Sequence, residues 1–160
     1  MMTRPLRNGL LIALLVILLD QVTKWIALSG VDFAANPISV TSFFDLVLVW
    51  NRGVSFGMFN DAGAAGPWIL SGLAIAVVFG LLYWLRQAET WLSVSALGLV
   101  IGGAIGNVID RFRFGAVVDF LDFHVAGWHW PAFNVADAAI CIGAGLLLLD
   151  GLLSPERQTT

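Results

Sequence analysis

The sequence predicts an all-α membrane protein with four transmembrane helices and a small extramembrane β-element between the first and second helices. Composition is the first observation: 59% of the 160 residues are hydrophobic and only 12% are charged, against about 45–50% and about 25% in soluble domains. Patterning is the second, because the apolar residues form four runs long enough to cross a bilayer as helices. We therefore expect a single integral membrane domain over residues 1–160, with spans at about 8–28, 67–86, 91–111 and 132–150.

The first apolar run, residues 9–19, has two interpretations. The preceding Arg4 and Arg7, with small residues around Ser29, are typical of a secretory signal peptide that is removed. The alternative is a retained helix over residues 8–28. We favour the retained helix, because a discarded peptide has no use for Asp20 and Lys24 one turn apart. The later runs also need a first one to set their orientation.

The segment between the first two spans favours strands. Residues 38–49 are rich in Val, Thr and Phe, which are common in strands. Residues 51–53 (NRG) are a turn signal, and residues 55–59 are a candidate return strand. We therefore expect a small β-element over about residues 38–59, lying on the membrane.

The second and third apolar runs, residues 68–85 and 91–109, are joined by a very short turn, and the fourth covers residues 133–149. Four spans place both termini on the same side of the membrane. Most arginines near the span ends fall on that side, which the positive-inside rule makes cytoplasmic. They are Arg4, Arg7, Arg86 and Arg157, opposed by Arg52 and Arg113. Residues 30–66 and 113–131 are then expected outside.

Polar residues from separate runs converge at the outer-leaflet end of this predicted bundle. Counting along the helices at ~1.5 Å per residue brings the following to that level: Asp20, Asn107, Asp110, Arg111, Asp119, Asn134 and Asp137. Asp119 is expected in the loop just outside the third span, and Asp137 about one turn into the fourth. Charges that meet or enter the lipid are costly, so they mark a functional site by default.

Structural roles account for several of these features. Asp20 and Lys24 can pair within one helix, and the helix face shared by Asn107, Asp110 and Arg111 could fasten the bundle. The recurrence of glycine at 98, 102 and 106 predicts close helix packing. Asp122 is expected to be solvated, and Asp150 to be an ordinary helix end facing the cytoplasm. Asp119 and Asp137 resist such explanations, because neither has a Lys or Arg within four residues.

Two function classes fit these residues. Two carboxylates in a poorly solvated site share a proton, so one can activate water while the other binds the scissile carbonyl. This describes an aspartyl hydrolase, for which we expect no metal and no cofactor. The alternative is a small proton-coupled membrane transporter, although its acids are expected near the midplane. A metalloprotease is disfavoured, since the two histidines form no HExxH pair. The sparse charges, with a net charge of −3, give no basis for nucleic-acid binding.

Five blocks of the sequence, in order, resemble the lipoprotein signal peptidases, the signal peptidase II family of bacterial aspartyl membrane proteases. Residues 20–24 (DQVTK) resemble its first-helix block, and residues 51–57 (NRGVSFG) its loop block, with Ser55 where Ala is common. Residues 102–111 (GGAIGNVIDR) are similar to its third-helix block. Residues 115–120 (GAVVDF) and 133–137 (FNVAD) resemble the two blocks that hold its catalytic aspartates.

The resemblance implies an aspartic endopeptidase of the bacterial inner membrane, with its active site at the outer leaflet. Its substrates would be prolipoproteins, cut on the N-terminal side of a diacylglyceryl-modified cysteine. Asp119 and Asp137 would be the catalytic pair, and the β-element would cover them. The implied supporting residues are Asn51, Gly53, Asn107, Asp110, Arg111, Asn134, Asp20 and Lys24. Membrane lipids are the other expected partners, and we expect a monomer.

Overall fold

The computed structural model describes residues 3–30, 36–53 and 65–153. Its helices are α1 (Arg4–Gly30), α2 (Gly66–Leu85), α3 (Trp91–Phe114) and α4 (Val135–Leu153). Within the described residues, four helices are long and apolar enough to cross a membrane, which confirms the predicted helical membrane fold. The candidate return strand at residues 55–59 lies outside the described residues.

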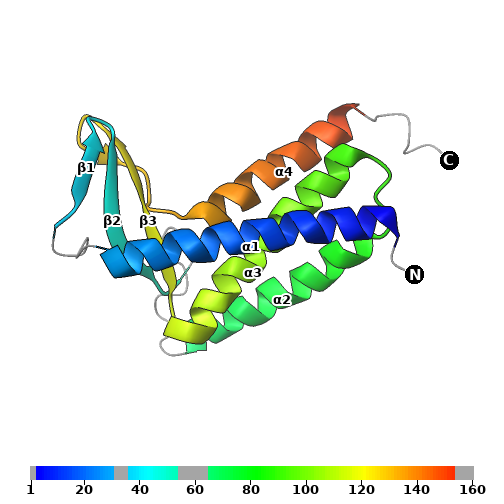
Figure 1. The fold of residues 1–160 in the computed structure, drawn as a ribbon, viewed down its shortest axis with the longest axis horizontal. Coiled ribbons are helices and arrows are strands. Elements are labelled where there is room, and N and C mark those ends of the chain that lie inside the picture. Colours follow the sequence, from blue (N-terminus) through cyan, green and yellow to red (C-terminus); the bar gives the residue numbers. More distant parts are fainter. Residues whose placement is uncertain (1–2, 31–35, 54–64, 154–160) are drawn as a thin grey trace.

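The central helix is α3, which packs against α1, α2 and α4 (Figure 1). Its glycines allow the close approach that their spacing predicted. A Cβ added at Gly98 would lie 2.7 Å from the carbonyl oxygen of Gly9, and one added at Gly102 would lie 2.7 Å from that of Ala13. Any side chain at these positions would push α1 away from α3. Large apolar side chains such as Phe79 and Leu152 are exposed on the outer faces, as expected where helices face lipid.

The sheet has four antiparallel strands in the order β1 (Ile38–Thr41), β2 (Phe44–Asn51), β3 (Val117–Val125) and β4 (Trp128–His129). The predicted β-element between the first two helices is therefore confirmed, but it forms only half of the sheet. The placing of Asp119 in a loop was wrong, because Asp119 lies on β3, which pairs with β2 along most of its length. The four residues that begin β3 are all buried, so this strand lacks the alternation by which a half-buried strand is recognised.

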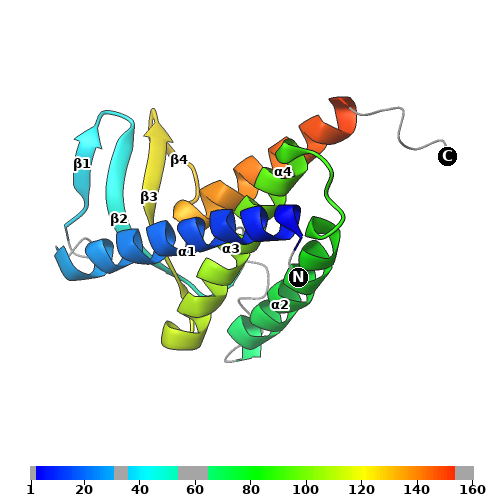
Figure 2. The same cartoon turned by 45° about the vertical axis from the view of Figure 1, so that its right-hand side comes forward.

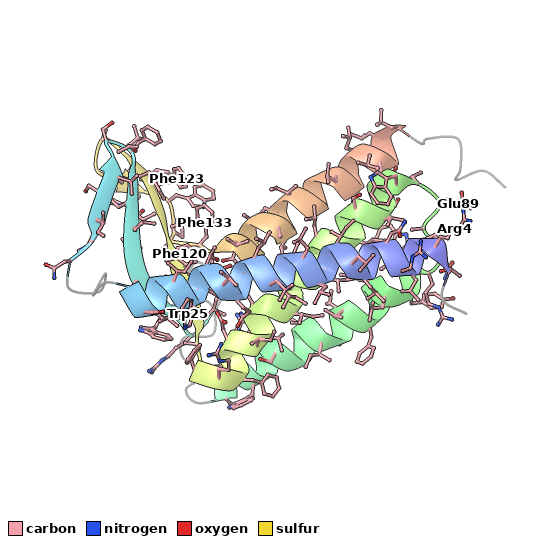
Figure 3. All side chains as sticks on the ribbon, in the orientation of Figure 1. Arg4, Trp25, Glu89, Phe120, Phe123 and Phe133 are labelled. Carbon is pink, nitrogen blue, oxygen red and sulfur yellow. The ribbon has the colours of Figure 1, made fainter. Side chains whose placement is uncertain are left out.

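The sheet lies at one end of the helix bundle, as Figures 1 and 2 show from two directions. Helix α1 begins and α4 ends at the opposite end, where Figure 3 labels Arg4 and Glu89. Trp25, at the other end of α1, lies near the sheet (Figure 3). The bundle thus has one end with the sheet and one end where α1 starts and α4 finishes.

Two acidic residues differ from the expectation of simple solvent exposure. Asp122 was predicted to be solvated, but its side chain is only 13% exposed and lies 2.8 Å from Nδ1 of His129. Asp150 accepts hydrogen bonds from the hydroxyls of Thr90, at 3.0 Å, and of Ser93. This carboxylate therefore ties the end of α4 to the start of α3, and it lies far along α4 from Asp137.

Candidate active site

Asp119 lies on strand β3, not in a loop as the sequence suggested, and it is 1% exposed. Helix α3 ends because Gly115 adopts a left-handed conformation, with φ at 68°, a conformation that glycine adopts without strain. The chain then turns directly into β3 and pairs with β2, where Asp119 faces Val49 in the register. This turn places a carboxylate against the end of the helix bundle.

Asp137 lies in the first turn of α4 and forms a capping box with Asn134. Its backbone N–H donates to Oδ1 of Asn134 at 3.0 Å, and its own Oδ2 accepts from the backbone N–H of Asn134 at 3.2 Å. Because Asn134 caps the helix, α4 begins at Val135 rather than at residue 132. The other carboxylate oxygen, Oδ1, accepts from the side-chain amide of Asn107 at 2.8 Å. The carboxylate is thus held on both of its oxygens.

The segment before α4 carries Asp137 to Asp119, because it pairs with strand β3. Phe133 exchanges backbone hydrogen bonds with Leu121, at 2.9 and 3.0 Å. Figure 3 shows Phe133 beside Phe120 and Phe123, between the sheet and the start of α4. The structure therefore brings together two aspartates that stand well apart in the sequence.

One side-chain amide bridges the two aspartates. Nδ2 of the fully buried Asn134 donates to Oδ1 of Asp119 at 2.7 Å, while its Oδ1 caps Asp137. The second oxygen of Asp119 accepts from Nδ2 of Asn51 at 3.0 Å. The backbone N–H of Gly53 donates to the amide oxygen of Asn51 at 3.1 Å, which turns the Asn51 NH₂ group toward Asp119. Amides from two elements thus set the orientation of the Asp119 carboxylate.

The surroundings of Asp119 favour its protonated form. Burial raises the pKa of Asp119 from 3.8 to about 7, and the neighbouring charge of Asp137 contributes to the rise. Hydrogen bonds from Asn51 and Asn134 and the charge of Lys24 act in the opposite direction without cancelling it. Asp119 therefore retains a proton up to neutral pH, as is typical of a carboxyl that shares its site with a second one.

The remaining predicted residues form two groups. Arg111 donates through its guanidinium to the carbonyl oxygens of Asn107, at 3.4 Å, and Gly53, at 3.5 Å, so it spans α3 and the end of β2. Asp110 helps to fasten the bundle, as the shared helix face had suggested, but within the described residues it forms no hydrogen bond or ion pair with Arg111. It pairs instead with Lys24 of α1, whose Nζ lies 2.8 Å from Asp110 Oδ2.

Asp20 completes this second group, since Lys24 Nζ also lies 2.9 Å from Asp20 Oδ2. The ion pair expected within the first helix is present, but it is buried rather than interfacial. The sequence reasoning did not single out Gln21, whose Nε2 donates to Asp20 at 3.1 Å and to Asp110 at 3.0 Å. Its position between Asp20 and Lys24 in the same block was the available signal.

Two cavities flank Asp137. One, of about 350 Å³, has a polar end formed by Asn51, Asn107 and Arg111 and apolar walls from α2, α3 and α4. The other, of about 430 Å³, lies between α4 and the segment before it, and its lining includes Trp130, Phe133 and Cys141. Among the described residues, Asp137 is the only charged one that lines this second cavity. The carboxylate therefore stands where a partly polar and an almost wholly apolar space meet.

Nothing in the described part of the chain groups three or more His, Cys, Asp or Glu side chains so that they could hold a metal ion. His124 and His129 instead stack on each other and face carboxylates of the sheet. Independence of a metal stays a prediction that rests on the sequence.

Fold and site together define a multi-pass membrane protein with a buried carboxyl group, that of Asp119, and a half-buried one, that of Asp137, at one end of its helix bundle. A family model described as Signal peptidase (SPase) II matches residues 12–153. The chain belongs to the signal peptidase II family, a family of peptidases, which confirms the resemblance carried by the five blocks.

Relatives of known sequence and structure agree with this assignment. The lipoprotein signal peptidase of Methylobacterium radiotolerans is 48% identical over 155 residues, covering 96% of this chain and 90% of that protein. That of Paraburkholderia phymatum is 49% identical over 142 residues, covering 88% and 85%. A solved bacterial membrane enzyme superposes with a TM-score of 0.81 at 28% identity, covering 95% of this chain and 93% of its own.

Proposed function

We propose that this protein is an aspartic endopeptidase that removes signal peptides from prolipoproteins, with Asp119 and Asp137 as its catalytic residues. One observation carries the proposal: two carboxylates from separate elements are held around a single amide, that of Asn134. Membership of the signal peptidase II family, and relatives named lipoprotein signal peptidase, supply the substrate class.

The two carboxylates divide the acid–base work. Asp137, held by Asn107, takes a proton from water, and the hydroxide adds to the scissile carbonyl carbon. Asp119, whose pKa is raised to about 7 by burial and then by Asp137, gives its proton to the carbonyl oxygen. The resulting tetrahedral intermediate collapses when Asp137 passes its proton to the leaving nitrogen, and Asp119 recovers its own from a hydroxyl. Both acids thus return to their starting states.

The flanking cavities suit the two sides of a prolipoprotein. The cavity along α2, α3 and α4 has apolar walls for a signal helix, and its Asn51, Asn107 and Arg111 can bind the peptide backbone. The second cavity offers almost only apolar side chains, which suits acyl chains rather than a peptide. A substrate lying across Asp137 would then be cut between its signal helix and its lipid-modified residue. We therefore propose cleavage N-terminal to the diacylglyceryl-modified cysteine.

Purified protein in lipid vesicles should convert a synthetic diacylglyceryl prolipoprotein peptide into two fragments. Mass spectrometry should find the lipid-modified cysteine at the new N-terminus, and the same peptide without its lipid should be cut much more slowly. No cleavage of the lipidated peptide by folded protein would contradict the proposal. Proton uptake by the same vesicles, followed with an internal pH dye, would then support the transporter alternative.

We further propose one integral membrane domain in the bacterial inner membrane, with both termini in the cytoplasm. The pair Asp119 and Asp137, called the dyad below, would lie at the outer leaflet. The start of α1 and the end of α4 at the bundle end opposite the sheet support this orientation. In a Cys141→Ala background, an impermeant thiol reagent added to spheroplasts should label Ser39→Cys on β1. It should not label Gln87→Cys between α2 and α3; both positions are exposed. External labelling of position 87 alone would reverse the orientation.

A further inference from the structure

We propose that Lys24 is a positioning residue for the reaction. It would hold both catalytic aspartates in place through three separate chains of hydrogen bonds, here called arms. The inference rests on the proposed function, because it assigns a role within the same site. Lys24 belongs to α1, and within the described residues it forms no hydrogen bond or ion pair with either aspartate. Any effect of Lys24 on the positions of the aspartates must therefore pass through the groups that it binds.

All three N–H donors of the Lys24 ammonium group have an acceptor. Lys24 is 2% exposed, and its Nζ lies 2.9 Å from Oδ2 of Asp20, 2.8 Å from Oδ2 of Asp110 and 3.1 Å from Oδ1 of Asn107. A lysine side chain has three N–H donors and no acceptor, so these three oxygens satisfy it. They come from α1 and α3, and each belongs to a side chain that also binds a group beside the two aspartates.

Two of the arms end on the backbone immediately before a catalytic residue. The second oxygen of Asp20, Oδ1, accepts from the backbone N–H of Ala136 at 3.0 Å, one residue before Asp137. Oδ2 of Asp110 accepts from the backbone N–H of Val118 at 3.1 Å, one residue before Asp119. The first turn of α4 and the buried start of β3 are thus fixed to the same ammonium group. Such a link sets the separation of the two aspartates.

The third arm sets the orientation of an amide. Oδ1 of Asn107 accepts from Lys24 and also from Asn134 Nδ2 at 3.2 Å. Its Nδ2 must then point the other way, and it donates to Oδ1 of Asp137 at 2.8 Å. An inverted amide would present its oxygen to the Asp137 carboxylate and its NH₂ group to two donors. Lys24 therefore favours the orientation in which Asn107 binds the catalytic carboxylate.

A buried ion pair is weak evidence of a stabilising role, because desolvation offsets the attraction. The charged groups around Lys24 and the dyad come from every neighbouring element: Asp20 on α1, Asp110 and Arg111 on α3, Asp119 on β3 and Asp137 on α4. Burial raises the pKa of Asp119, and the charge of Lys24 opposes that rise. Loss of Lys24 should therefore raise the pKa of Asp119 further, an effect that a purely structural role would not produce.

The test compares two variants with one matched control. Lys24→Met removes the ammonium group but leaves two buried carboxylates unpaired. The triple variant Lys24→Met/Asp20→Asn/Asp110→Asn removes those charges too, while each Asn keeps an oxygen to accept from Ala136 or Val118. Arg113→Met is the control: Arg113 donates to Gln21 at 3.2 Å in the same region, but within the described residues it forms no hydrogen bond or ion pair with Lys24, its three partners or either aspartate.

In the prolipoprotein assay, kcat per folded molecule should fall between about tenfold and about 100-fold in the Lys24 variants, as for other small misplacements of reacting groups. KM should stay within about threefold, because Lys24 lines neither cavity. The fall in kcat that deprotonation of Asp119 should cause at alkaline pH, the alkaline limb of the pH–rate profile, should move to higher pH. If Lys24→Met does not fold, the same measurements on the triple variant test the inference.

Wild-type kcat and an unmoved alkaline limb in a folded Lys24 variant would overturn the inference, as would a rise in KM alone. Arg113→Met should cleave like the wild type in every case. If the wild type and Arg113→Met do not cleave at all, the proposed function fails. If both cleave and the Lys24 variants match them, only the role of Lys24 fails.

Discussion

Asp119→Asn and Asp137→Asn should each lower the kcat/KM for a prolipoprotein by at least ~100-fold. General acid–base groups contribute about 10²–10⁴-fold each, and neither aspartate alone can supply both the base for water and the proton for the carbonyl oxygen. The bridging amide of Asn134, 2.7 Å from Asp119 and in a capping box with Asp137, makes the two act as one unit. The measurement is initial cleavage rate against substrate concentration, with purified wild type and variants in the same lipid.

Residues that act as a unit are strongly non-additive, so the double variant should be little worse than either single one. Both single variants should stay folded and inserted, because an amide is less costly than an ionisable carboxyl group in a buried or half-buried position. The controls are Asp122→Asn on the same strand and Asp150→Asn on the same helix. Each substitution keeps one acceptor oxygen, lies outside the proposed catalytic pair and should retain nearly normal cleavage. Near-normal turnover in either folded dyad variant would end the aspartyl mechanism.

The helices could be predicted because they depend on local features, and a local feature also made the two aspartates candidates. Apolar runs of membrane-spanning length define α1 to α4, and the lack of a nearby cation singled out Asp119 and Asp137. The capping box was also accessible, since Asn134 and Asp137 stand three positions apart before an apolar run. What the local pattern could not reveal was strand β3, whose buried start reads like the continuation of α3 until Gly115 ends the helix.

The hydrogen-bonded network around the dyad depends on how the helices cross, which no local pattern encodes. Lys24 reaches Asp110 only because the glycines of α3 let α1 approach closely. A Cβ at Gly106 would lie 2.6 Å from Oδ2 of Asp20, the oxygen that binds Lys24. The sequence therefore predicted an ion pair within α1, whereas the structure shows a link between α1, α3, β3 and α4.

The pH dependence of cleavage should report on Asp119. Burial and the neighbouring Asp137 raise its pKa to about 7, so the group loses its proton as the pH rises through neutrality. If the protonated form is the one that donates to the carbonyl oxygen, kcat should fall about tenfold per pH unit above the midpoint. Cleavage at pH 9 should then be on the order of 100-fold slower than the plateau below pH 7.

The raised pKa of Asp119 also makes the stability of the folded protein depend on pH. Because the folded-state pKa lies above the usual value of 3.8, the contribution of Asp119 to stability is fully present below that value. It is lost as the pH rises toward about 7. The alkaline fall in kcat must therefore be measured per folded molecule, with folding checked at each pH by circular dichroism or tryptophan fluorescence.

The variant Asn51→Ala tests whether the alkaline fall in kcat is due to Asp119. The hydrogen bond from Asn51 to Asp119, at 3.0 Å, lowers the pKa of that carboxyl against the effect of burial. Its removal should move the alkaline midpoint to higher pH, while Asp122→Asn on the same strand should leave the midpoint where it is. A flat profile between pH 6 and pH 9 with folded protein would mean that Asp119 carries no essential proton. A midpoint that Asn51→Ala shifts to lower pH would assign the limb to a group other than Asp119.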